Sequence, residues 1–202
     1  ALGMKVPGGE AGGEAAERAL VAATGDSSRE TRAVAIRALG ALHTDSASRT
    51  LETLATGTSS DAPAAFSTLA AASPARAAAL ADRTMSSGST SMRRAVVASA
   101  SVLPPADAKR ILASALHDAD EGIAETAVSQ LANVGGAAAQ QSLLDVLSSD
   151  ATDAVKRAAA DALAASGSDA AQQHQSLIDR WKSSDSGGDE AQPDESDNED
   201  LD

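Results

Sequence analysis

The chain has 202 residues and a formal net charge of −13, with no cysteine, no tyrosine, one phenylalanine and one tryptophan. The lack of cysteine excludes disulfides and thiolate metal sites, and no apolar run is long enough to span a membrane. Residues 183–202 hold nine acids and no base, so the rest of the chain carries 20 acids against 16 bases. This near balance argues against nucleic acid as the partner, because nucleic-acid binding usually needs a basic face.

The start of the chain reads as the end of a repeat. Its first letters, ALG, return inside the amphipathic segment 32–42, where they fall near a helix end. We therefore expect residues 1–13 to comprise the end of a preceding repeat and a Gly-rich loop at 4–13. Residues 14–25 then form a second helix whose own partner is missing, and the chain is expected to be a fragment of a longer protein. A chance match at an unstructured start is the alternative.

Five pairs of amphipathic segments follow, with apolar residues three and four positions apart as in helices. The first helices are expected at 32–42, 63–72, 93–103, 125–134 and 153–165. The second helices are expected at 47–55, 75–85, 107–116, 138–147 and 170–181. No segment alternates with the period of a strand, so no sheet is expected.

Two apolar series tie the pairs together. In the second helices a step of 31 residues joins Ala23, Leu54, Met85, Leu116, Leu147 and Ile178. In the first helices the looser series is Leu39, Leu69, Ala100, Leu131 and Leu163. A unit that recurs at a fixed period buries its apolar face against its neighbours, so the pattern predicts a solenoid over residues 14–182.

Residues typical of helix ends agree with these bounds. We expect the following glycines to close second helices in the left-handed conformation: Gly25, Gly57 and Gly88. Two pairs have capping-box spacing at first-helix starts, namely Ser27 with Glu30 and Asp118 with Glu121. Pro74 and Pro105 fall in the first turn of second helices, where a missing N–H is tolerated.

Two-helix units of about 31 residues, with a first helix such as residues 155–167, resemble HEAT-type repeats of the short, bacterial HEAT-like class that includes phycobilisome lyases. The resemblance covers residues 14–182 and implies an all-α, right-handed α-solenoid. It also implies a ladder between repeats, built from an aspartate before each first helix and a base six residues later. The matching pairs are Asp26 with Arg32 and Asp150 with Lys156. Arg94 keeps the base without the aspartate, and Pro63 and Glu125 depart from the pattern.

Motifs for chemistry are scarce. The histidines at 43, 117 and 174 are far apart and none precedes a glutamate, so the di-iron hydroxylase activity of some HEAT-like proteins is not implied. The densest polar cluster is HDADEG at 117–122. It could be a metal site using His117, Asp118, Asp120 and Glu121, but we favour a turn with carboxylates at a helix N-terminus. We therefore expect no catalytic, cofactor-binding or metal-binding residue and no cofactor.

The favoured function is a non-enzymatic scaffold that binds another protein, or another part of its parent chain, on the face made by second helices. Candidate surface residues at comparable positions are Arg49, Glu52, Arg83, Arg110 and Asp145. Their charges have mixed sign, so they indicate no ligand type. The alternative is a subunit or domain of a HEAT-like lyase or hydroxylase. Residues 183–202 are expected to be disordered, either as a solubility tail, which we favour, or as a segment that attracts basic partners.

Overall fold

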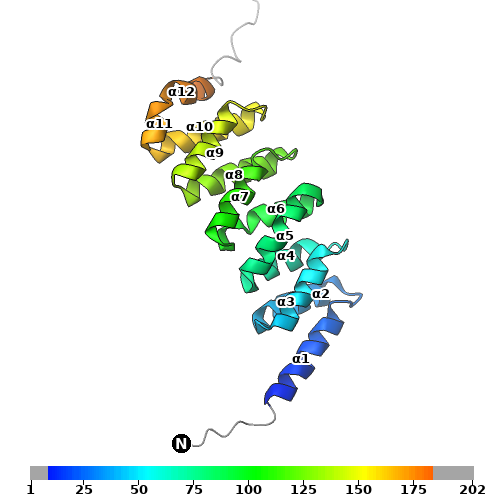
Figure 1. Cartoon of the computed structure of the whole chain (residues 1–202). Coiled ribbons are helices and arrows are strands. Elements are labelled where there is room, and N and C mark those ends of the chain that lie inside the picture. The colour runs from blue at the N-terminus through cyan, green and yellow to red at the C-terminus, as the bar shows by residue number, and fades with distance from the viewer. Residues whose placement is uncertain (1–8, 184–202) are drawn as a thin grey trace, which may run out of the picture.

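The structure is a computed structural model that describes residues 9–183, and these residues form twelve α-helices, one short 3-10 helix (η1) and no strand. The helices stack as a rising series of pairs (Figure 1). Their bounds are α1 Gly9–Ala23, α2 Arg29–Leu42, α3 Asp45–Thr56, α4 Ala62–Ala72, α5 Pro74–Ser87, α6 Thr90–Ala98, η1 Ala100–Val102, α7 Pro105–Ala115, α8 Glu121–Val134, α9 Ala137–Leu147, α10 Asp153–Ser166, α11 Asp169–Gln173 and α12 Gln175–Ser183.

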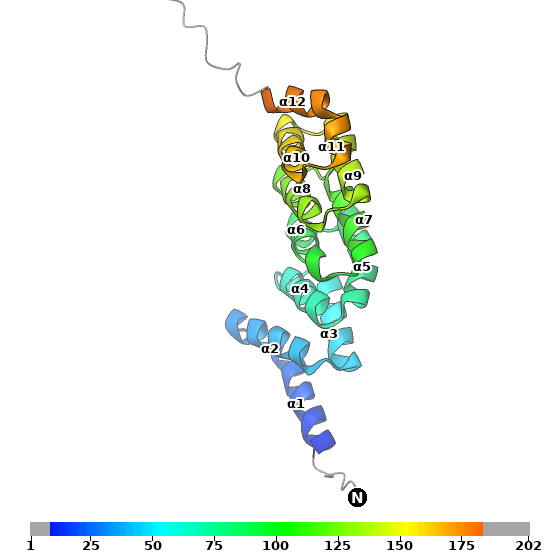
Figure 2. The same ribbon diagram turned by 90° about the vertical axis from the view of Figure 1, so that its left-hand side faces the viewer.

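The helices lie in two layers. The first helices α2, α4, α6, α8 and α10 form one layer, and α3, α5, α7, α9 and α11 form the other (Figure 2). Each first helix packs against its own second helix and against the first helix of the next pair. The expected all-α solenoid of helix pairs is therefore confirmed. The expected remnant of a repeat at 1–3 and almost all of the expected tail lie outside the described residues.

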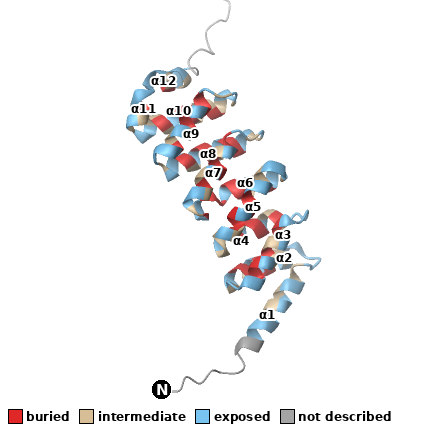
Figure 3. Cartoon of the chain, viewed as in Figure 1, coloured by how far each residue is buried: buried red, intermediate tan, exposed pale blue. Residues whose placement is uncertain are grey.

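The first-helix series forms the most uniform part of the core. Its five members are at most 1 % exposed: Leu39, Leu69, Ala100, Leu131 and Leu163. Burial follows the inner side of every pair along the whole solenoid (Figure 3). The inner first helices α4, α6 and α8 each contact their own second helix and the first helices before and after them.

The 31-residue series in the second helices is buried only in its C-terminal half. Leu116, Leu147 and Ile178 are at most 3 % exposed. Leu54 and Met85 are partly exposed beside the core. The helices explain the difference, since α5 packs on α7 and α7 on α9, whereas α3 and α5 barely touch. The prediction that this whole series is buried was therefore wrong for its N-terminal half.

Helix α1 starts earlier than the sequence suggested. It begins at Gly9, so residues 9–13, which we expected to be loop, are helical. A glycine in a helix interior costs about 1 kcal/mol of helix stability. Each residue added to the helix also adds a backbone hydrogen bond, so the helix extends through the glycines. The remainder of the expected loop lies outside the described residues.

The caps of α2 and α8 lie one and two residues beyond the predicted caps, Ser27 and Asp118. The cap of α2 is Ser28, whose Oγ accepts from the Thr31 N–H at 3.3 Å. The carboxylate of Asp26 accepts from the Ser28 N–H at 2.7 Å, and this local turn sets the cap two residues after the aspartate. The prediction with Ser27 as cap was wrong for this reason.

Helix α8 repeats this arrangement. Its cap is Asp120, whose Oδ1 accepts from the Ile123 N–H at 3.1 Å. Asp118 lies two residues earlier and accepts from the Asp120 N–H at 2.8 Å. Asp118 is therefore not the cap of α8 that we predicted, and its carboxylate is free to bind elsewhere.

The expected left-handed glycines are also misplaced. Gly57 and Gly88 have φ of −76°, and their extended conformation carries the chain toward the next pair. Gly25 is likewise outside the positive-φ residues, which follow first helices: His43, Gly135, Gly136 and Gly167. The reversals after α2, α8 and α10 use positive φ, whereas those after α4 and η1 turn without it at Ser73 and Leu103. Gly88 is required for space, because a Cβ there would lie 2.5 Å from the Thr84 carbonyl oxygen.

Two predicted helices are interrupted. The segment 93–103 divides into α6 and η1 after Ser99, whose Oγ donates to the Ala95 carbonyl at 2.8 Å. The segment 170–181 divides at His174, whose Nδ1 lies 2.9 Å from the Ala170 carbonyl oxygen. The predicted helix starts at Pro74 and Pro105 are confirmed.

Candidate interaction surface

The structure places all five candidate residues on second helices. Arg49 and Glu52 lie on α3, Arg83 on α5, Arg110 on α7 and Asp145 on α9. We call the exposed side of these four helices the second-helix face. Apart from the half-buried Glu52, the candidates are exposed. The 31-residue repeat therefore locates comparable surface positions, although it predicts none of their contacts.

Ion pairs cross this face from helix to helix. Arg76 of α5 pairs with Asp45 of α3 and, at 3.2 Å, with Glu52 of α3. Arg49 also pairs with Asp45. The hydrogen bond from Arg49, with a further contribution from Arg76, lowers the pKa of the Asp45 carboxyl. Arg76 therefore joins two second helices that barely touch.

Arg110 makes the equivalent link one pair later. Its guanidinium pairs with Asp82 of α5 and, at 2.8 Å, with Asp107 of its own helix. The hydrogen bonds to Asp107 and Asp82 raise the pKa of Arg110. Helices α3, α5 and α7 thus form one cross-linked row on the second-helix face.

The other two candidates differ from this network. Asp145 accepts a hydrogen bond from Gln141 one turn earlier at 2.8 Å. The guanidinium of Arg83 forms no hydrogen bond or ion pair with any other residue that the structure describes, although the Arg83 carbonyl accepts from the Ser87 hydroxyl at 3.0 Å. The network residues Asp45, Arg76 and Asp107 were not singled out from the sequence, although Asp45 and Arg76 are 31 positions apart with opposite charge. Opposite charges at one repeat phase were the signal that could have found them.

A second set of ion pairs lies along the loop edge, the edge formed by the connections that lead from a second helix into the next first helix. Arg32 of α2 pairs with Asp61 in the connection before α4, with Nε and Oδ2 2.5 Å apart. Arg32 also donates to the Asp26 carbonyl at 3.0 Å, but its charge partner is Asp61. The ladder between repeats therefore exists here, with Asp61 in place of the expected Asp26.

The junction between α6 and α8 is closed most firmly. Arg93 donates to both carboxylate oxygens of Asp118, at 2.7 and 2.9 Å. The side chain of Asp118 is 5 % exposed. Arg94 adds a more exposed pair with Asp120 at 3.2 Å. The hydrogen bond from Arg93 lowers the pKa of the Asp118 carboxyl, and the same bond raises the pKa of Arg93.

In the last predicted ladder pair, Asp150 with Lys156, the lysine contacts an aromatic ring instead of the aspartate. The ammonium of Lys156 lies 4.8 Å from the centre of the Trp181 ring, a cation–π contact. The indole N–H of Trp181 donates to the Leu147 carbonyl at 3.2 Å. Lys156 thus connects α10 to the last helix, and its expected pairing with Asp150 was wrong.

The two positions that depart from the ladder pattern lie beside open clefts. At the α4–α6 junction, where Pro63 replaces the base, a cleft of about 400 Å³ separates the connection 57–61 from the connection 88–89. At the α8–α10 junction, near Glu125, a smaller cleft of about 230 Å³ is lined by His117, Glu121 and Asp150. At the α2–α4 and α6–α8 junctions, by contrast, arginines of the first helix bind carboxylates across the loop edge.

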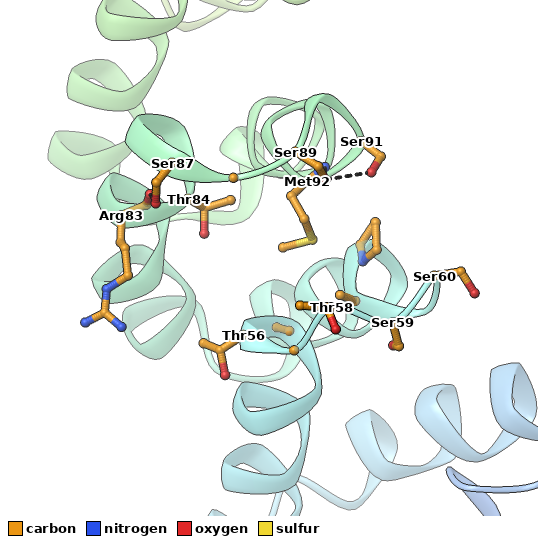
Figure 4. A pocket seen from close by; sticks show the side chains of 15 residues that line it. Thr56, Thr58, Ser59, Ser60, Arg83, Thr84, Ser87, Ser89, Ser91 and Met92 are labelled. Atoms are coloured by element: carbon orange, nitrogen blue, oxygen red, sulfur yellow. Dashed lines mark hydrogen bonds between the residues drawn. The ribbon is translucent and has the colours of Figure 1, made fainter.

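The larger cleft, which we call the serine cleft, is rich in hydroxyl groups. Eight serines and threonines line it, together with Arg83 and an apolar part formed by Ala55, Ala62, Pro63 and Met92. Figure 4 shows Met92 pointing into the space between the two connections, and Arg83 extending outward at one side. Several hydroxyls are occupied within the protein, as in the 2.9 Å bond between Ser89 and Ser91.

The cluster at 117–122 is consistent with the turn interpretation. Asp118 binds Arg93, Asp120 caps α8, and Glu121 accepts from the Thr152 hydroxyl at 2.6 Å. In the part of the chain that the structure describes, no group of three or more histidine or carboxylate side chains is arranged to hold a metal ion.

Comparisons with known proteins give one match. The family model described as HEAT repeats matches residues 77–185, which is more than half of the 202 residues. No curated protein matches the chain. Of the helices between residues 9 and 183, none has the length and apolar character needed to cross a membrane.

Proposed function

Because the chain belongs to the HEAT repeat family, we propose that it is a non-enzymatic scaffold that binds a protein partner on its second-helix face. HEAT repeats commonly mediate protein–protein interaction, and stacked repeats present extended surfaces suited to it. The proposal places the partner along α3, α5, α7 and α9.

The observation that carries the proposal is the cross-linked row of charges on this face. Arg76 and Arg110 each bind two carboxylates, and at least one of the two belongs to a neighbouring second helix. Exposed ion pairs contribute about 0–1 kcal/mol to stability, so a network of this kind is a weak stabiliser. Its stronger effect is to order long side chains in advance, which lowers the entropy cost of binding.

The core leaves this face free for a partner. The buried apolar residues lie between the two helix layers, so the second helices need no further cover to be stable. The lyase or hydroxylase alternative has no supporting cluster of metal ligands within residues 9–183.

Site-specific photocrosslinking tests the proposal. A photoreactive amino acid replaces exposed Ser86 on α5 or Ser114 on α7, with exposed Ser67 on α4 and Ser129 on α8 as matched controls on first helices. In extract of the organism that makes the protein, we expect one protein to be captured from the two second-helix positions. Capture of that protein only from the first-helix positions would place the partner on the other layer and contradict the proposal.

A further inference from the structure

We infer that the serine cleft binds an extended acidic segment of a partner protein, with a carboxylate of that segment paired to Arg83. The inference rests on the proposed function, because it needs a protein partner. It adds the place where one segment of that partner binds and the charge that the segment carries.

The charge around the cleft is positive and uncompensated. None of the residues that line it is acidic, and Arg83 is its one charged residue. The carboxylates nearest in sequence to the lining are engaged elsewhere: Asp61 binds Arg32, Glu52 binds Arg76 and Asp82 binds Arg110. In a chain with a net charge of −13, this leaves a local site that attracts a negative group.

Arg83 differs from the other arginines of the second-helix face. Arg49, Arg76 and Arg110 each have a carboxylate within ion-pair distance. Arg83 is exposed and has no such partner among residues 9–183. A guanidinium presents a planar fork of donors that matches a carboxylate in two parallel hydrogen bonds. Arg83 is thus the arginine of this face that remains free to bind a carboxylate from another chain.

The lining suits the backbone and side chains of an extended segment. Thr58 and Ser60 line the cleft without a hydrogen bond to other described residues, so their hydroxyls can bond a peptide backbone. Met92 and Pro63 supply an apolar surface beside them, and methionine adapts to irregular partners. The volume of about 400 Å³ falls in the range of ligand-binding clefts, and its position at the loop edge lets a chain pass through.

A carboxylate fits this site better than a phosphate. Phosphorylated segments are usually bound by clusters of arginines. The cleft offers a single guanidinium, which matches one carboxylate in charge and geometry. Aliphatic residues beside the acid would contact Met92 and Pro63.

Selection of peptides from a random display library on the full chain is the test. We expect enrichment of peptides that combine aspartate or glutamate with an aliphatic residue. An enriched peptide should bind Arg83→Glu roughly tenfold more weakly, because the pairing charge is reversed. Thr58→Trp, which fills the cleft from an exposed loop position, should weaken binding similarly. Arg37→Glu makes the same charge change at an exposed site on α2 and should leave binding within about twofold.

Four results would overturn the inference: no enrichment, enrichment of neutral or basic peptides, unchanged binding to both Arg83→Glu and Thr58→Trp, or tighter binding of a phosphorylated peptide. The outcome is separable from that of the proposed function. If the partner still crosslinks at Ser86 and Ser114 in the Thr58→Trp variant, the proposed scaffold function is supported and binding at the serine cleft is contradicted. If acidic peptides bind the cleft but the partner crosslinks only from the first-helix positions, the cleft inference is supported and the second-helix face is contradicted as the binding surface.

Discussion

The α4–α6 and α6–α8 junctions are neighbours in one solenoid, yet they are closed in different ways. At α6–α8 two arginines bind carboxylates across the loop edge, and Leu116 behind them is 2 % exposed. At α4–α6 no ion pair between described residues crosses the loop edge, a cleft of about 400 Å³ remains, and Leu54 and Met85 are only partly buried. On the second-helix face, Arg76 links α3 to α5 and Arg110 links α5 to α7, and no ion pair between described residues links α7 to α9.

The comparison separates two sets of ion pairs between repeats, one on the second-helix face and one at the loop edge. Ion pairs on the second-helix face link α3, α5 and α7, whereas at the loop edge arginines bind carboxylates across α6–α8 and, among the described residues, not across α4–α6. Pro63 cannot supply a base, and the α4–α6 junction stays open. Ala62 and Pro63 stand 31 residues before Arg93 and Arg94, so the α4–α6 junction lacks both bases that close α6–α8 at the loop edge.

Removing the buried leucine of the closed junction should have the largest effect. Leu116→Ala should lower the free energy of unfolding by about 2–5 kcal/mol, the usual cost of a cavity in a core. Leu54→Ala should cost about 1–2 kcal/mol, because its side chain is already partly in water. Denaturant titration measures both values. Because each repeat touches only its neighbours, Leu116→Ala should also raise amide exchange over roughly residues 90–150 and leave residues 14–45 nearly unchanged.

Equal losses from the two leucine substitutions would show that both junctions are equally well packed. Loosening of the whole chain by either one would argue for a single cooperative core instead of stacked repeats.

Breaking the Arg93–Asp118 ion pair should come next in size. Arg93→Met should cost about 3 kcal/mol, because it leaves the buried carboxylate of Asp118 without its charge partner. Arg94→Met is the matched control and should cost less than about 1 kcal/mol, because the Arg94 side chain is 62 % exposed. Thermal or urea unfolding separates the two. Similar small costs would mean that the α6–α8 junction is held by apolar packing alone.

The same pair predicts a pH dependence. The hydrogen bond from Arg93 holds the pKa of Asp118 below its ordinary value, so the folded state favours the carboxylate. Its stabilisation is complete above the unfolded pKa of about 4 and is lost as the pH falls through the lower folded value. The stability difference between wild type and Arg93→Met should therefore be constant near neutral pH and shrink below about pH 4. Urea titrations across this range measure it, and the cost of Leu116→Ala, which removes no charge, should not follow that curve.

Building a bridge into the open junction should have the smallest effect on stability. Arg94 pairs with Asp120, the cap of α8 that lies 26 residues later, and the matching positions at α4–α6 are Pro63 and Ser89, the cap of α6. Pro63→Arg with Ser89→Asp should show a favourable coupling of about 0.5 kcal/mol in a double-mutant cycle. Aspartate keeps the cap because it is as good a capping residue as serine. The same double variant should weaken the binding of acidic peptides by narrowing the cleft, and a coupling of zero would show that α4 and α6 are too far apart to be bridged.

Periodicity made the fold predictable. The spacing of apolar residues located the helix pairs, and the series from Leu39 to Leu163 proved buried throughout. Such burial follows from local repetition, since every first helix meets the same neighbours. Burial of the series from Leu54 to Ile178 was harder to predict, because second helices contact each other unequally along the stack.

Individual contacts were harder to predict. Sequence spacing placed Asp118 as a helix cap, whereas its carboxylate binds Arg93, 25 residues earlier. Arg32 likewise reaches forward to Asp61. These choices depend on how neighbouring repeats are rotated relative to one another, which no periodicity within one helix encodes. The five surface candidates lie on second helices, as the repeat predicted, but the links from Glu52 to Arg76 and from Arg110 to Asp82 appear only when adjacent helices are side by side.

The position of Trp181 gives the molecule an optical label at one end. It is the only tryptophan, the chain has no tyrosine, and its indole is fixed between Lys156 and the Leu147 carbonyl. Its fluorescence therefore reports whether α12 stays docked on α9 and α10, while circular dichroism averages over all the helices. Fraying from the C-terminal end would change the emission before the ellipticity, and unfolding that starts near α1 would reverse that order.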